Sequence, residues 1–256
     1  MKLQQHIVEL ELMKSYPKEL SYAGNLALLS SKKISIVGAR KTSKYSRELT
    51  HKLALALAKR GMVIVSGGAI GVDAVAHSSA GAANTIAILP CGIEIKYPKI
   101  NKNLLTNIEK EGLLLSPFQD DFKAAPWSFV SRNELVVALG DVLVVAEAEL
   151  KSGSMRSVEF ALKMGKKIFV FPHRLGESSA TNKLLQEGKA QAIYDIEEFA
   201  NSFVSLDKQV SYTDDFLEFC KTTPTYEDAL SKFPNRVFEA ELSGEIVVKN
   251  AKVFLA

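Results

Sequence analysis

A glycine-rich stretch, Ser66-Gly-Gly-Ala-Ile-Gly-Val-Asp73, could bind a phosphate group. Glycine lets backbone N–H groups come close to an anion, and the dipole of a following helix favours negative charge at that point. We therefore expect a phosphate-binding turn at a helix amino terminus, formed by Gly67, Gly68, Ala69 and Gly71. No Gly-Lys-Ser/Thr follows, so the chemistry of a Walker loop is not supported. The glycines could instead form an ordinary strand-to-helix turn, and Asp73 is better placed to cap the helix than to act as a base.

A second phosphate-binding turn is predicted at Lys151-Ser-Gly-Ser154, ahead of a helical segment. A cation, hydroxyls and backbone N–H groups come together in this turn, which consists of Lys151, Ser152, Gly153 and Ser154. This combination suits a phosphate. Taken alone, the turn could equally be an ordinary capped helix start.

Basic and aromatic side chains that follow an apolar run indicate a polyanionic ligand. Arg40 ends the run and is followed by Lys41, Lys44 and Tyr45. A planar guanidinium, two amines and an aromatic ring on one rim would suit a phosphodiester backbone. The basic excess extends over residues 31–60, which contain nine Lys and Arg residues against one Glu. Because a basic run is more often a solvated helix face, the position of these residues in the fold must decide between the two interpretations.

The segment Phe129-Val-Ser-Arg-Asn133 could recognise a base. Phe129 could stack on the base while Arg132 and Asn133 form hydrogen bonds with its edge. An apolar helix is predicted directly after this segment, over residues 135–139. The aromatic ring could instead belong to the core.

Side chains that would support catalysis or metal binding are sparse. The four histidines show no metal-ligand spacing and do not accompany a convincing Ser or Cys nucleophile. The two cysteines, Cys91 and Cys220, are far apart, so neither a disulfide framework nor a structural zinc site is predicted. The acid–base candidates are Glu94, Glu147 and Glu159. We therefore expect a binding protein rather than an enzyme, with no metal and no cofactor.

Short apolar runs alternate with helical segments and would position these loops. Runs with the length of buried strands cover residues 34–37, 62–65, 85–89, 113–115, 141–145 and 168–171. Segments of helical period lie between them, for example over 46–59 and 157–164. This alternation predicts an α/β fold with a doubly wound, Rossmann-like parallel sheet. The candidate loops would then meet at one edge, because ligands of such sheets bind at the carboxyl ends of the strands.

The carboxyl-terminal part has a different composition. From Ser211 onward it contains five basic and eight acidic residues, in a chain whose net charge is +3. Its pattern predicts two helices and a small hairpin, which is typical of a winged-helix-like module. The predicted organisation is a short amino-terminal extension (1–29), a Rossmann-like DNA-binding domain (30–203), a linker (204–211) and the winged-helix-like module (212–256).

Composition places the chain among ordinary globular proteins, with 47% hydrophobic and 24% charged residues. The longest apolar runs are shorter than the roughly 20 residues that span a bilayer. The first residues lack the pattern of a secretory signal. We therefore expect a cytoplasmic protein without a membrane-spanning helix.

Several motifs in order resemble the DprA family of DNA-processing proteins, which acts in natural transformation. The motifs are Tyr16-Pro17-Lys-Glu-Leu20, Ile36-Val-Gly-Ala-Arg40 with Ser43 and Tyr45, Ser66 to Asp73, Tyr97-Pro98 with Asn101, Phe129 with Arg132-Asn133, Ser152-Gly-Ser154 and Thr181-Asn182. The resemblance covers residues 16–193. It implies an extended Rossmann domain that binds incoming single-stranded DNA, protects it from nucleases and helps to load the RecA recombinase, acting as a homodimer without catalytic activity. The DNA-binding residues that we infer from motifs and resemblance together are Arg40, Ser43, Lys44, Tyr45, Gly67, Gly68, Ala69, Gly71, Phe129, Arg132, Asn133, Lys151, Ser152, Gly153 and Ser154.

The chain departs from the family pattern at three places. It has Gly-Ala-Arg40 where Gly-Ser-Arg is common, Ser116-Pro117 where Ser-Glu is usual, and Glu134 in place of an arginine after Arg132-Asn133. Glu134 makes the predicted groove locally less basic. The acidic terminal module is a poor phosphate binder, so we assign it to protein contacts in preference to DNA.

Two other functions remain open at this stage. The first is a Rossmann-type nucleoside monophosphate phosphoribohydrolase. Of the Pro-Gly-Gly-x-Gly-Thr-x-x-Glu motif of those enzymes, the stretch 151–159 keeps only Gly153 and Glu159. The second is a scaffold whose contact with DNA is incidental.

Overall fold

The computed structural model describes residues 1–204, 215–243 and 245–255. Contacts within the chain divide it into two compact units, Met1–Val204 and Ser205–Ala256. Apart from Val204, the linker predicted over 204–211 lies outside the described residues.

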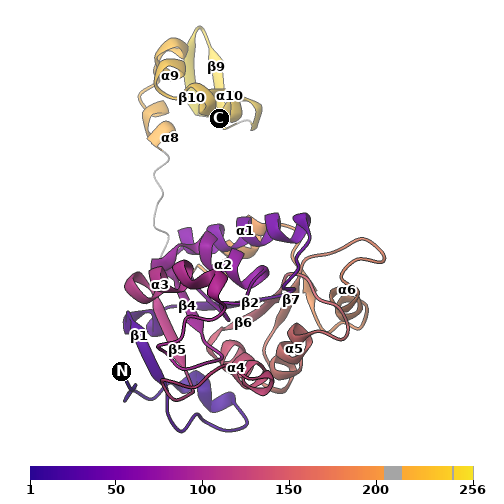
Figure 1. Cartoon of the computed structure of the whole chain (residues 1–256). Helices are drawn as coiled ribbons and strands as arrows, with labels where there is room; N and C mark the ends of the chain where they lie inside the picture. The colour runs from indigo at the N-terminus through magenta and orange to yellow at the C-terminus, as the bar shows by residue number, and fades with distance from the viewer. Residues whose placement is uncertain (205–214, 244, 256) are drawn as a thin grey trace. The chain divides into compact units, whose positions relative to one another are not determined.

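An eight-stranded sheet forms the centre of residues 1–204 (Figure 1). Its strands are β1 (Ser21–Gly24), β2 (Lys33–Val37), β3 (Val63–Ser66), β4 (Thr85–Ile88), β5 (Leu113–Ser116), β6 (Val142–Val145), β7 (Ile168–Val170) and β8 (Gln191–Ala192). Their order across the sheet is β1-β5-β4-β3-β2-β6-β7-β8. All neighbours from β2 to β8 pair in parallel, and β1 pairs antiparallel with β5. The predicted doubly wound parallel sheet is therefore confirmed, and its topological switch point lies between β2 and β6, where the chain changes its direction of travel.

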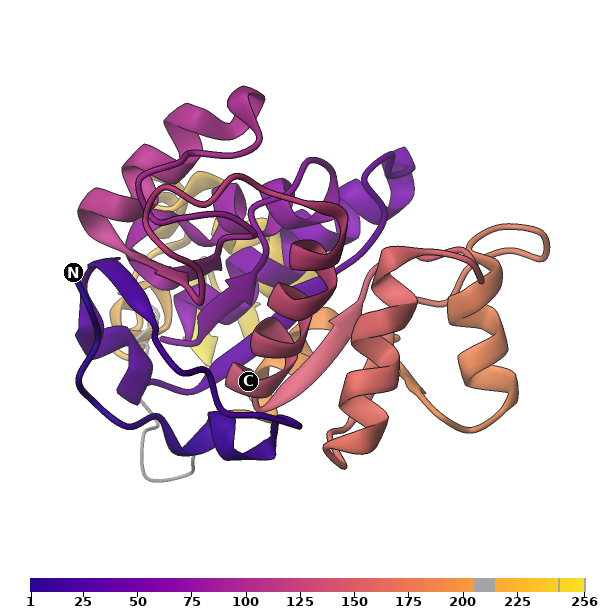
Figure 2. The same cartoon turned by 60° about the horizontal axis from the view of Figure 1, so that its bottom comes forward.

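Helices cover both faces of the sheet, because the strands are apolar on both sides. The α-helices of this unit are α1 (Lys44–Lys59), α2 (Val72–Ala80), α3 (Lys102–Glu111), α4 (Pro126–Leu139), α5 (Gly153–Lys163), α6 (Ser179–Gln186) and α7 (Ile196–Asn201). Along β2, Ile34 and Ile36 join the core cluster that contains residues of α1, α2 and α7, whereas Val37 joins the cluster that contains residues of α4, α5 and α6. Figure 2 turns the second face toward the reader, with α4 and α5 side by side.

The first 30 residues pack against the sheet and the adjacent helix. Besides β1 they contain two short 3-10 helices, η1 (Val8–Leu12) and η2 (Leu26–Ser30). Leu10 is fully buried, and the buried Lys33 Nζ lies 2.8 Å from the Glu9 carboxylate. The apolar runs in the sequence did not indicate β1, because this edge strand has only four residues, Ser-Tyr-Ala-Gly, and only the first of them is buried.

The helix α4 begins earlier than the sequence predicted. Phe129–Asn133 were expected to precede a helix at 135–139, but the helix is continuous over Pro126–Leu139, so this expectation was wrong. Proline at the first helical position is favourable, and the Ser128 hydroxyl accepts a hydrogen bond from the Ala125 N–H. Phe129, Arg132 and Asn133 are thus held on a rigid element.

The described part of the second unit contains three helices and a hairpin. They are α8 (Asp215–Cys220), α9 (Tyr226–Lys232), α10 (Pro234–Ser243), β9 (Ile246–Lys249) and β10 (Lys252–Leu255). Their side chains form a core of their own, which includes Phe216, Val237 and Val253. The winged-helix assignment remains a prediction. In the parts of the chain that the structure describes, no helix is long and apolar enough to cross a bilayer.

Candidate nucleic-acid interface

Two hollows lie at the carboxyl edge of the sheet beside the switch point. The larger, which we call the switch-point cavity, has a volume of about 510 Å³ and is lined by residues that follow β2 and β6 and by α4. The smaller, which we call the aromatic pocket, has a volume of about 80 Å³ and includes Tyr97, Pro98 and Phe129 in its wall. Arg40, Ala69, Phe129 and Arg132 line both hollows. The two hollows are therefore neighbours that share one wall.

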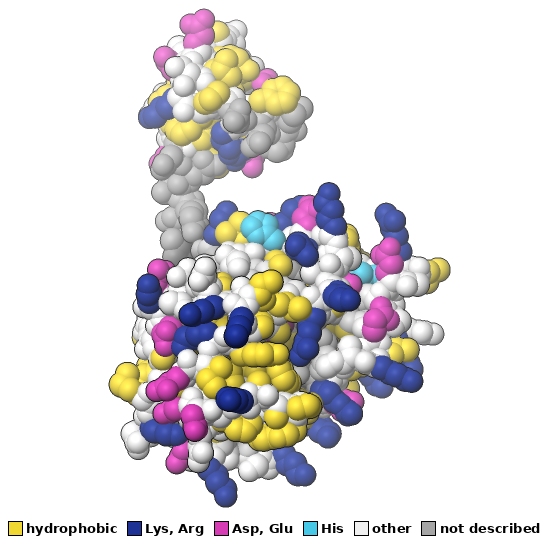
Figure 3. Space-filling model, in the orientation of Figure 1, with side chains coloured by type: hydrophobic (Ala, Val, Ile, Leu, Met, Phe, Trp, Pro, Cys, Tyr) yellow, Lys and Arg dark blue, Asp and Glu magenta, His cyan; other side chains and the backbone are white. Residues whose placement is uncertain are grey.

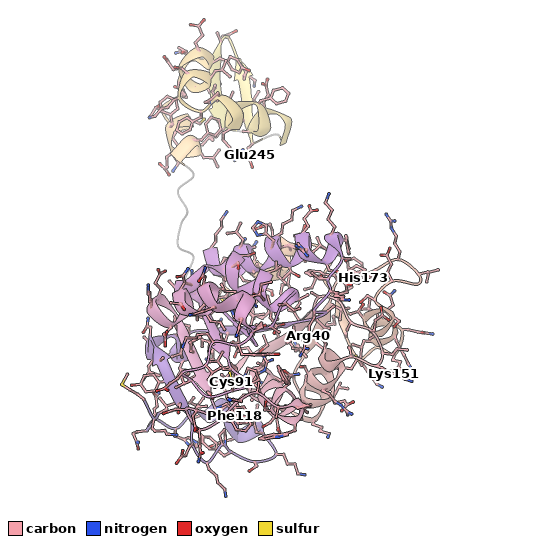
Figure 4. The ribbon with its side chains drawn as sticks, viewed as in Figure 1. Arg40, Cys91, Phe118, Lys151, His173 and Glu245 are labelled. Atoms are coloured by element: carbon pink, nitrogen blue, oxygen red, sulfur yellow. The ribbon has the colours of Figure 1, made fainter. Side chains whose placement is uncertain are left out.

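Arg40 is presented on an outer face that combines hydrophobic and basic side chains. Figure 4 shows Arg40 near the middle of the first unit, with Lys151 further toward α5 and α6. In the same orientation, hydrophobic side chains gather on this face, with Lys and Arg side chains around them (Figure 3). Such a surface offers contacts both to bases and to phosphates.

Arg40 and Phe129 meet in the shared wall, and Tyr97 adjoins them from the aromatic pocket. The Arg40 guanidinium carbon lies 5.2 Å from the centre of the Phe129 ring. The Tyr97 ring meets Phe129 edge to face, with 5.8 Å between the ring centres. Phe129 is partly buried, while Arg40 and Tyr97 are exposed. The site thus presents a cation and an aromatic pair that a flat, anionic ligand could contact.

A buried ion pair lies under the glycine-rich loop. Arg132 and Asp73 are almost fully buried, and Arg132 Nη1 lies 3.8 Å from Asp73 Oδ2. Asp73 Oδ2 also accepts hydrogen bonds from the N–H groups of Gly67 and Ala69, at 3.2 and 3.4 Å. Burial raises the pKa of Asp73, and the Arg132 guanidinium together with the two N–H groups opposes that rise. The Asp73 carboxylate therefore binds two of the backbone N–H groups that we expected to bind a phosphate.

The same geometry explains two of the glycines. A Cβ added at Gly67 would lie 1.1 Å from Arg132 Nη1, so the guanidinium occupies the space of a side chain. Gly71 has a φ of 83°, and a Cβ there would lie 2.3 Å from the carbonyl oxygen of Ala39. Both glycines are thus required by packing or backbone conformation, as the ordinary-turn interpretation of the loop proposed.

Glu147 fixes the segment after Arg40. Its carboxylate accepts hydrogen bonds from the Ser43 N–H at 2.8 Å, from the Ser43 hydroxyl at 2.9 Å and from the Thr42 hydroxyl at 3.0 Å. Partial burial raises the pKa of Glu147, but these hydrogen bonds outweigh it and lower the pKa overall. Ser43 also caps α1 by accepting a hydrogen bond from the Ser46 N–H. A carboxylate that is held ionised in this way is a poor general acid, and its role here is to shape the loop.

The turn before α5 forms the far wall of the switch-point cavity. Ser152, Gly153 and Ser154 line the cavity, while Lys151 is exposed on the turn. The Asn133 side-chain amide donates a hydrogen bond to the Gly153 carbonyl oxygen at 3.4 Å. Asn133 thereby connects α4 to α5 across the cavity.

The structure brings together part of the predicted set. Residues that line one or both hollows are Arg40, Gly67, Ala69, Phe129, Arg132, Asn133, Ser152, Gly153 and Ser154. Ser43, Lys44, Tyr45, Gly68, Gly71 and Lys151 do not line either hollow. Contact of any of these residues with DNA stays a prediction.

Tyr45 and Gly68 have other neighbours. The Tyr45 hydroxyl donates a hydrogen bond to the Pro172 carbonyl oxygen, and its ring meets His173 edge to face. The Gly68 carbonyl oxygen accepts a hydrogen bond from the Asn101 side chain. Both residues have roles in holding neighbouring loops in place.

Sequence reasoning missed Tyr97, Glu147 and the Asp73–Arg132 pair as parts of the site. The sequence signal that could have identified Tyr97 is its position directly before Pro98 in the family motif. Nothing in the local sequence pointed to Glu147 as the partner of Ser43, or to Asp73 as the partner of Arg132.

The basic excess of residues 31–60 is smaller at the surface than in the sequence. Lys33 is buried beside Glu9, Arg60 pairs with Glu197, and Lys52 pairs with Glu48. Arg40, Lys41 and Lys44 are exposed, and Arg40 and Lys41 line the switch-point cavity. Of the nine basic residues in 31–60, Arg40 and Lys41 are therefore the ones that line the cavity.

The acid–base and metal candidates do not form a catalytic centre. Glu159 pairs with Arg156 at 2.9 Å and does not line the switch-point cavity. Burial lowers the pKa of His77 to about 3, and its Nδ1 lies 2.5 Å from the Thr85 hydroxyl. Among the described residues, no cluster of His, Cys, Asp and Glu could hold a metal ion. The position of Glu159 counts against the phosphoribohydrolase alternative.

Fold and site together define a Rossmann-like α/β protein with a basic, aromatic-lined candidate site at its switch point. The sequence profile of the family described as DNA recombination-mediator protein A matches residues 4–204, and the chain belongs to this family. The descriptions of this family and of its relatives refer to DNA processing and recombination. The family expected from the sequence motifs is confirmed.

Relatives and solved structures agree with this membership. The DNA processing protein DprA of Streptococcus pneumoniae is 36% identical over 176 residues, which are 67% of this chain and 62% of that protein. The DprA of Bacillus subtilis is 32% identical over 205 residues, which are 78% of this chain and 68% of that protein. Both relatives are described as DNA-processing proteins, and the matched part of this chain spans about two thirds of their length.

Among solved structures, the chain resembles DNA processing protein A from Helicobacter pylori. The TM-score is 0.77 at 42% identity, covering 79% of this chain and 94% of that one, and that structure concerns a single-stranded DNA-binding mode. The X-ray structure of Streptococcus pneumoniae DprA gives a TM-score of 0.72 at 32% identity, covering 78% of this chain and 71% of that one.

Proposed function

We propose that this chain binds single-stranded DNA without sequence preference, through the switch-point cavity and the aromatic pocket. The observation that carries the proposal is the Arg40 guanidinium placed 5.2 Å over Phe129 between the two hollows. A guanidinium can bind a backbone phosphate while the neighbouring rings contact a base. The Helicobacter pylori relative, whose structure concerns single-stranded DNA binding, supports the choice of ligand.

The geometry favours a single strand over a duplex. A base can reach Phe129 and Tyr97 only if it is unstacked from its neighbours, and a matched duplex keeps its bases stacked inside. Contacts of this kind read the flat face of a base and the charge of the backbone, so they carry no base code. A poly-dT strand should therefore bind well, and a matched duplex much less well.

The Arg40 guanidinium lies over the face of the Phe129 ring. A base that stacks on this ring must share the ring with the guanidinium or displace it. The exposed side chain of Arg40 can make this change without disturbing the core, since it extends from the loop after β2. Arg40 is thus expected to affect both the phosphate and the base contact.

The test is fluorescence anisotropy of a labelled poly-dT strand and its duplex form at several salt concentrations. Arg40→Ala should weaken binding of the single strand and reduce the slope of log K against log salt by about one unit. Arg174→Ala removes another exposed arginine, which lines neither hollow, and serves as the matched control. Equal binding of both DNA forms, or an Arg40→Ala protein that binds like the control, would contradict the proposal. Nucleotide hydrolysis should then be assayed, because the phosphoribohydrolase is the alternative.

We also propose the finer activities of the family for this chain: protection of single-stranded DNA from nucleases, help in loading RecA, and action as a homodimer. They are supported by membership in the family and by the resemblance of the motifs. Light scattering of the purified chain tests the dimer. RecA-dependent strand exchange, with and without this protein, tests the loading.

We assign the second unit, as a winged-helix-like module, to protein contact. Its acidic balance supports this choice, because phosphates would be repelled. Removal of residues 212–256 should leave the affinity for poly-dT almost unchanged. A large loss of DNA affinity in the truncated chain would instead assign this module to DNA.

A further inference from the structure

The switch-point cavity has the size and the position of a small-molecule site. At about 510 Å³ it is within the range of about 300–1,000 Å³ typical of small-molecule sites, and it lies between β2 and β6, where ligands of doubly wound sheets bind. The aromatic pocket next to it holds only about 80 Å³. The larger cavity therefore has room for a whole nucleotide.

The amino terminus of α5 opens into this cavity without a side-chain cap. Ser152 is the N-cap residue of this 11-residue helix, but its side chain makes no capping hydrogen bond. Its hydroxyl oxygen is buried and has no hydrogen-bond partner among the described residues. The first N–H groups of a helix need partners from outside the helix, and an anion supplies them.

A buried arginine supplies an independent indication of a ligand. Arg132 lines the cavity and is only 4% exposed. Its Nε atom has no hydrogen-bond partner among the described residues, although Nη1 faces Asp73 at 3.8 Å. Buried donors are rarely left without a partner, so an acceptor in the cavity would satisfy this N–H group.

Gly153 keeps the space over the helix end open. A Cβ added at this position would meet nothing within 4 Å, and the φ of the residue is not in the left-handed region. Neither packing nor backbone conformation requires a glycine there, unlike at Gly67 and Gly71. A glycine at this place lets a ligand approach the backbone N–H groups closely.

We propose that the switch-point cavity binds a phosphate monoester, carried either by the end of a DNA strand or by a free nucleoside monophosphate. A terminal phosphate has three free oxygens and a charge of about −1.5 to −2, whereas an internal diester has two free oxygens and one charge. The Ser152 hydroxyl, the N–H groups that begin α5 and the Arg132 Nε can supply several donors to it, and the exposed Arg40 and Lys41 add positive charge.

The two carboxylates that line the cavity are already engaged. Asp73 faces Arg132, and Glu149 accepts a hydrogen bond from the Ser179 hydroxyl.

If the monoester is the end of a DNA strand, the inference rests on the single-strand binding proposed above and adds one subsite to it.

The test compares three labelled strands with the full chain: dT10 phosphorylated at the 5′ end, dT10 phosphorylated at the 3′ end, and unphosphorylated dT11. The longer strand adds an internal phosphate charge without a monoester. We expect one of the phosphorylated strands to bind about tenfold more tightly than dT11. Unlabelled dTMP, with thymidine as its control, serves as a competitor in the same assay.

Three variants locate the effect. Gly153→Ala should fill the open space, and Ser152→Ala should remove the hydroxyl, so both should abolish the advantage of the phosphorylated strand. Ser78→Ala changes an exposed serine of α2 and should keep the advantage. Thermal unfolding should be close to that of the wild type for all three, because none of the substitutions removes a hydrogen bond or a packing contact that the described structure records.

The outcomes separate the inference from the proposed function. An end-phosphate advantage that Gly153→Ala abolishes supports the inference with the strand end as source. Competition by dTMP but not thymidine, lost in Gly153→Ala, supports it with a free nucleotide as source. Equal binding of all three strands without competition by dTMP overturns the inference and leaves single-strand binding intact. If none of the strands binds, the proposed function fails, and direct calorimetry with dTMP decides the inference.

Discussion

Replacing Arg132 by methionine should destabilise the first unit by about 3 kcal/mol. The substitution keeps a long, flexible apolar stem but leaves the Asp73 carboxylate buried without its cation. Breaking a buried ion pair from one side costs about 3–5 kcal/mol. The lower end applies here, because the nitrogen–oxygen distance is already 3.8 Å and the N–H groups of Gly67 and Ala69 still satisfy part of the carboxylate. For a unit of this size the loss corresponds to a decrease in Tm of about 6–12 °C.

The assay uses the single tryptophan of the chain. Trp127 lies on α4, the helix that carries Arg132, so its fluorescence reports unfolding of the first unit independently of the second. Asp73→Asn in the same chain removes the orphaned charge, so the double variant should regain most of the lost stability. Arg174→Met, at an exposed position, controls for the loss of an arginine.

The pH dependence of the single variant follows from the carboxyl group. Burial raises the pKa of Asp73, and loss of Arg132 removes a group that opposes the rise. A group whose pKa is raised on folding contributes stability that is present below its unfolded pKa and is lost as the pH rises through its folded pKa. The deficit of Arg132→Met should therefore shrink on acidification, because protonation of Asp73 removes the unpaired charge.

The same variants decide what Arg132 does for DNA. If Arg132 only supports the glycine-rich loop, the double variant should bind poly-dT nearly as well as the wild type. If it contacts the strand, the double variant should be stable and still bind weakly. A deficit below about 1 kcal/mol in Arg132→Met, or no recovery in the double variant, would falsify the ion-pair argument itself.

Three more results are expected. Phe129→Ala should weaken binding of poly-dT by about 1–3 kcal/mol, as anisotropy can measure, while Phe129→Tyr should keep most of the affinity because it keeps an aromatic ring. Glu147→Gln should make the free energy of unfolding, measured by chemical denaturation, depend less on pH in acid. The lowered pKa of Glu147 contributes stability that is present above the ordinary value of 4.5 and is lost as the pH falls through the folded pKa. A pH dependence equal to that of the wild type would speak against this. Burial raises the pKa of Cys91 to about 11, so its thiol should react with iodoacetamide at neutral pH only after unfolding, as peptide mass analysis can show; rapid labelling of the folded chain would refute this.

The sequence alone predicted the architecture and the edge of the sheet at which the candidate site lies. Apolar runs of strand length alternate with helical periods, and parallel strands necessarily place their carboxyl ends at one edge. The convergence of Arg40, the glycine-rich loop and the Lys151–Ser154 turn could therefore be predicted from local patterns together with one rule of topology. Helical periodicity gave the wrong start for α4 and placed Phe129 before this helix. The reason is that the buried polar side chains of Ser128 and Arg132 interrupt the apolar pattern of the helix.

Only the tertiary structure decided which groups are free to meet a ligand. Asp73 and Arg132 are 59 positions apart, and Ser43 and Glu147 are 104 apart, yet each pair meets in the fold. The choice of such partners depends on how whole elements pack, because the desolvation of a buried charge is offset only by a group that packing brings close. The glycine-rich loop illustrates the consequence, because the N–H groups of Gly67 and Ala69 bind a carboxylate of the chain itself. At Gly153, in contrast, an added Cβ would meet nothing within 4 Å, so the start of α5 is open.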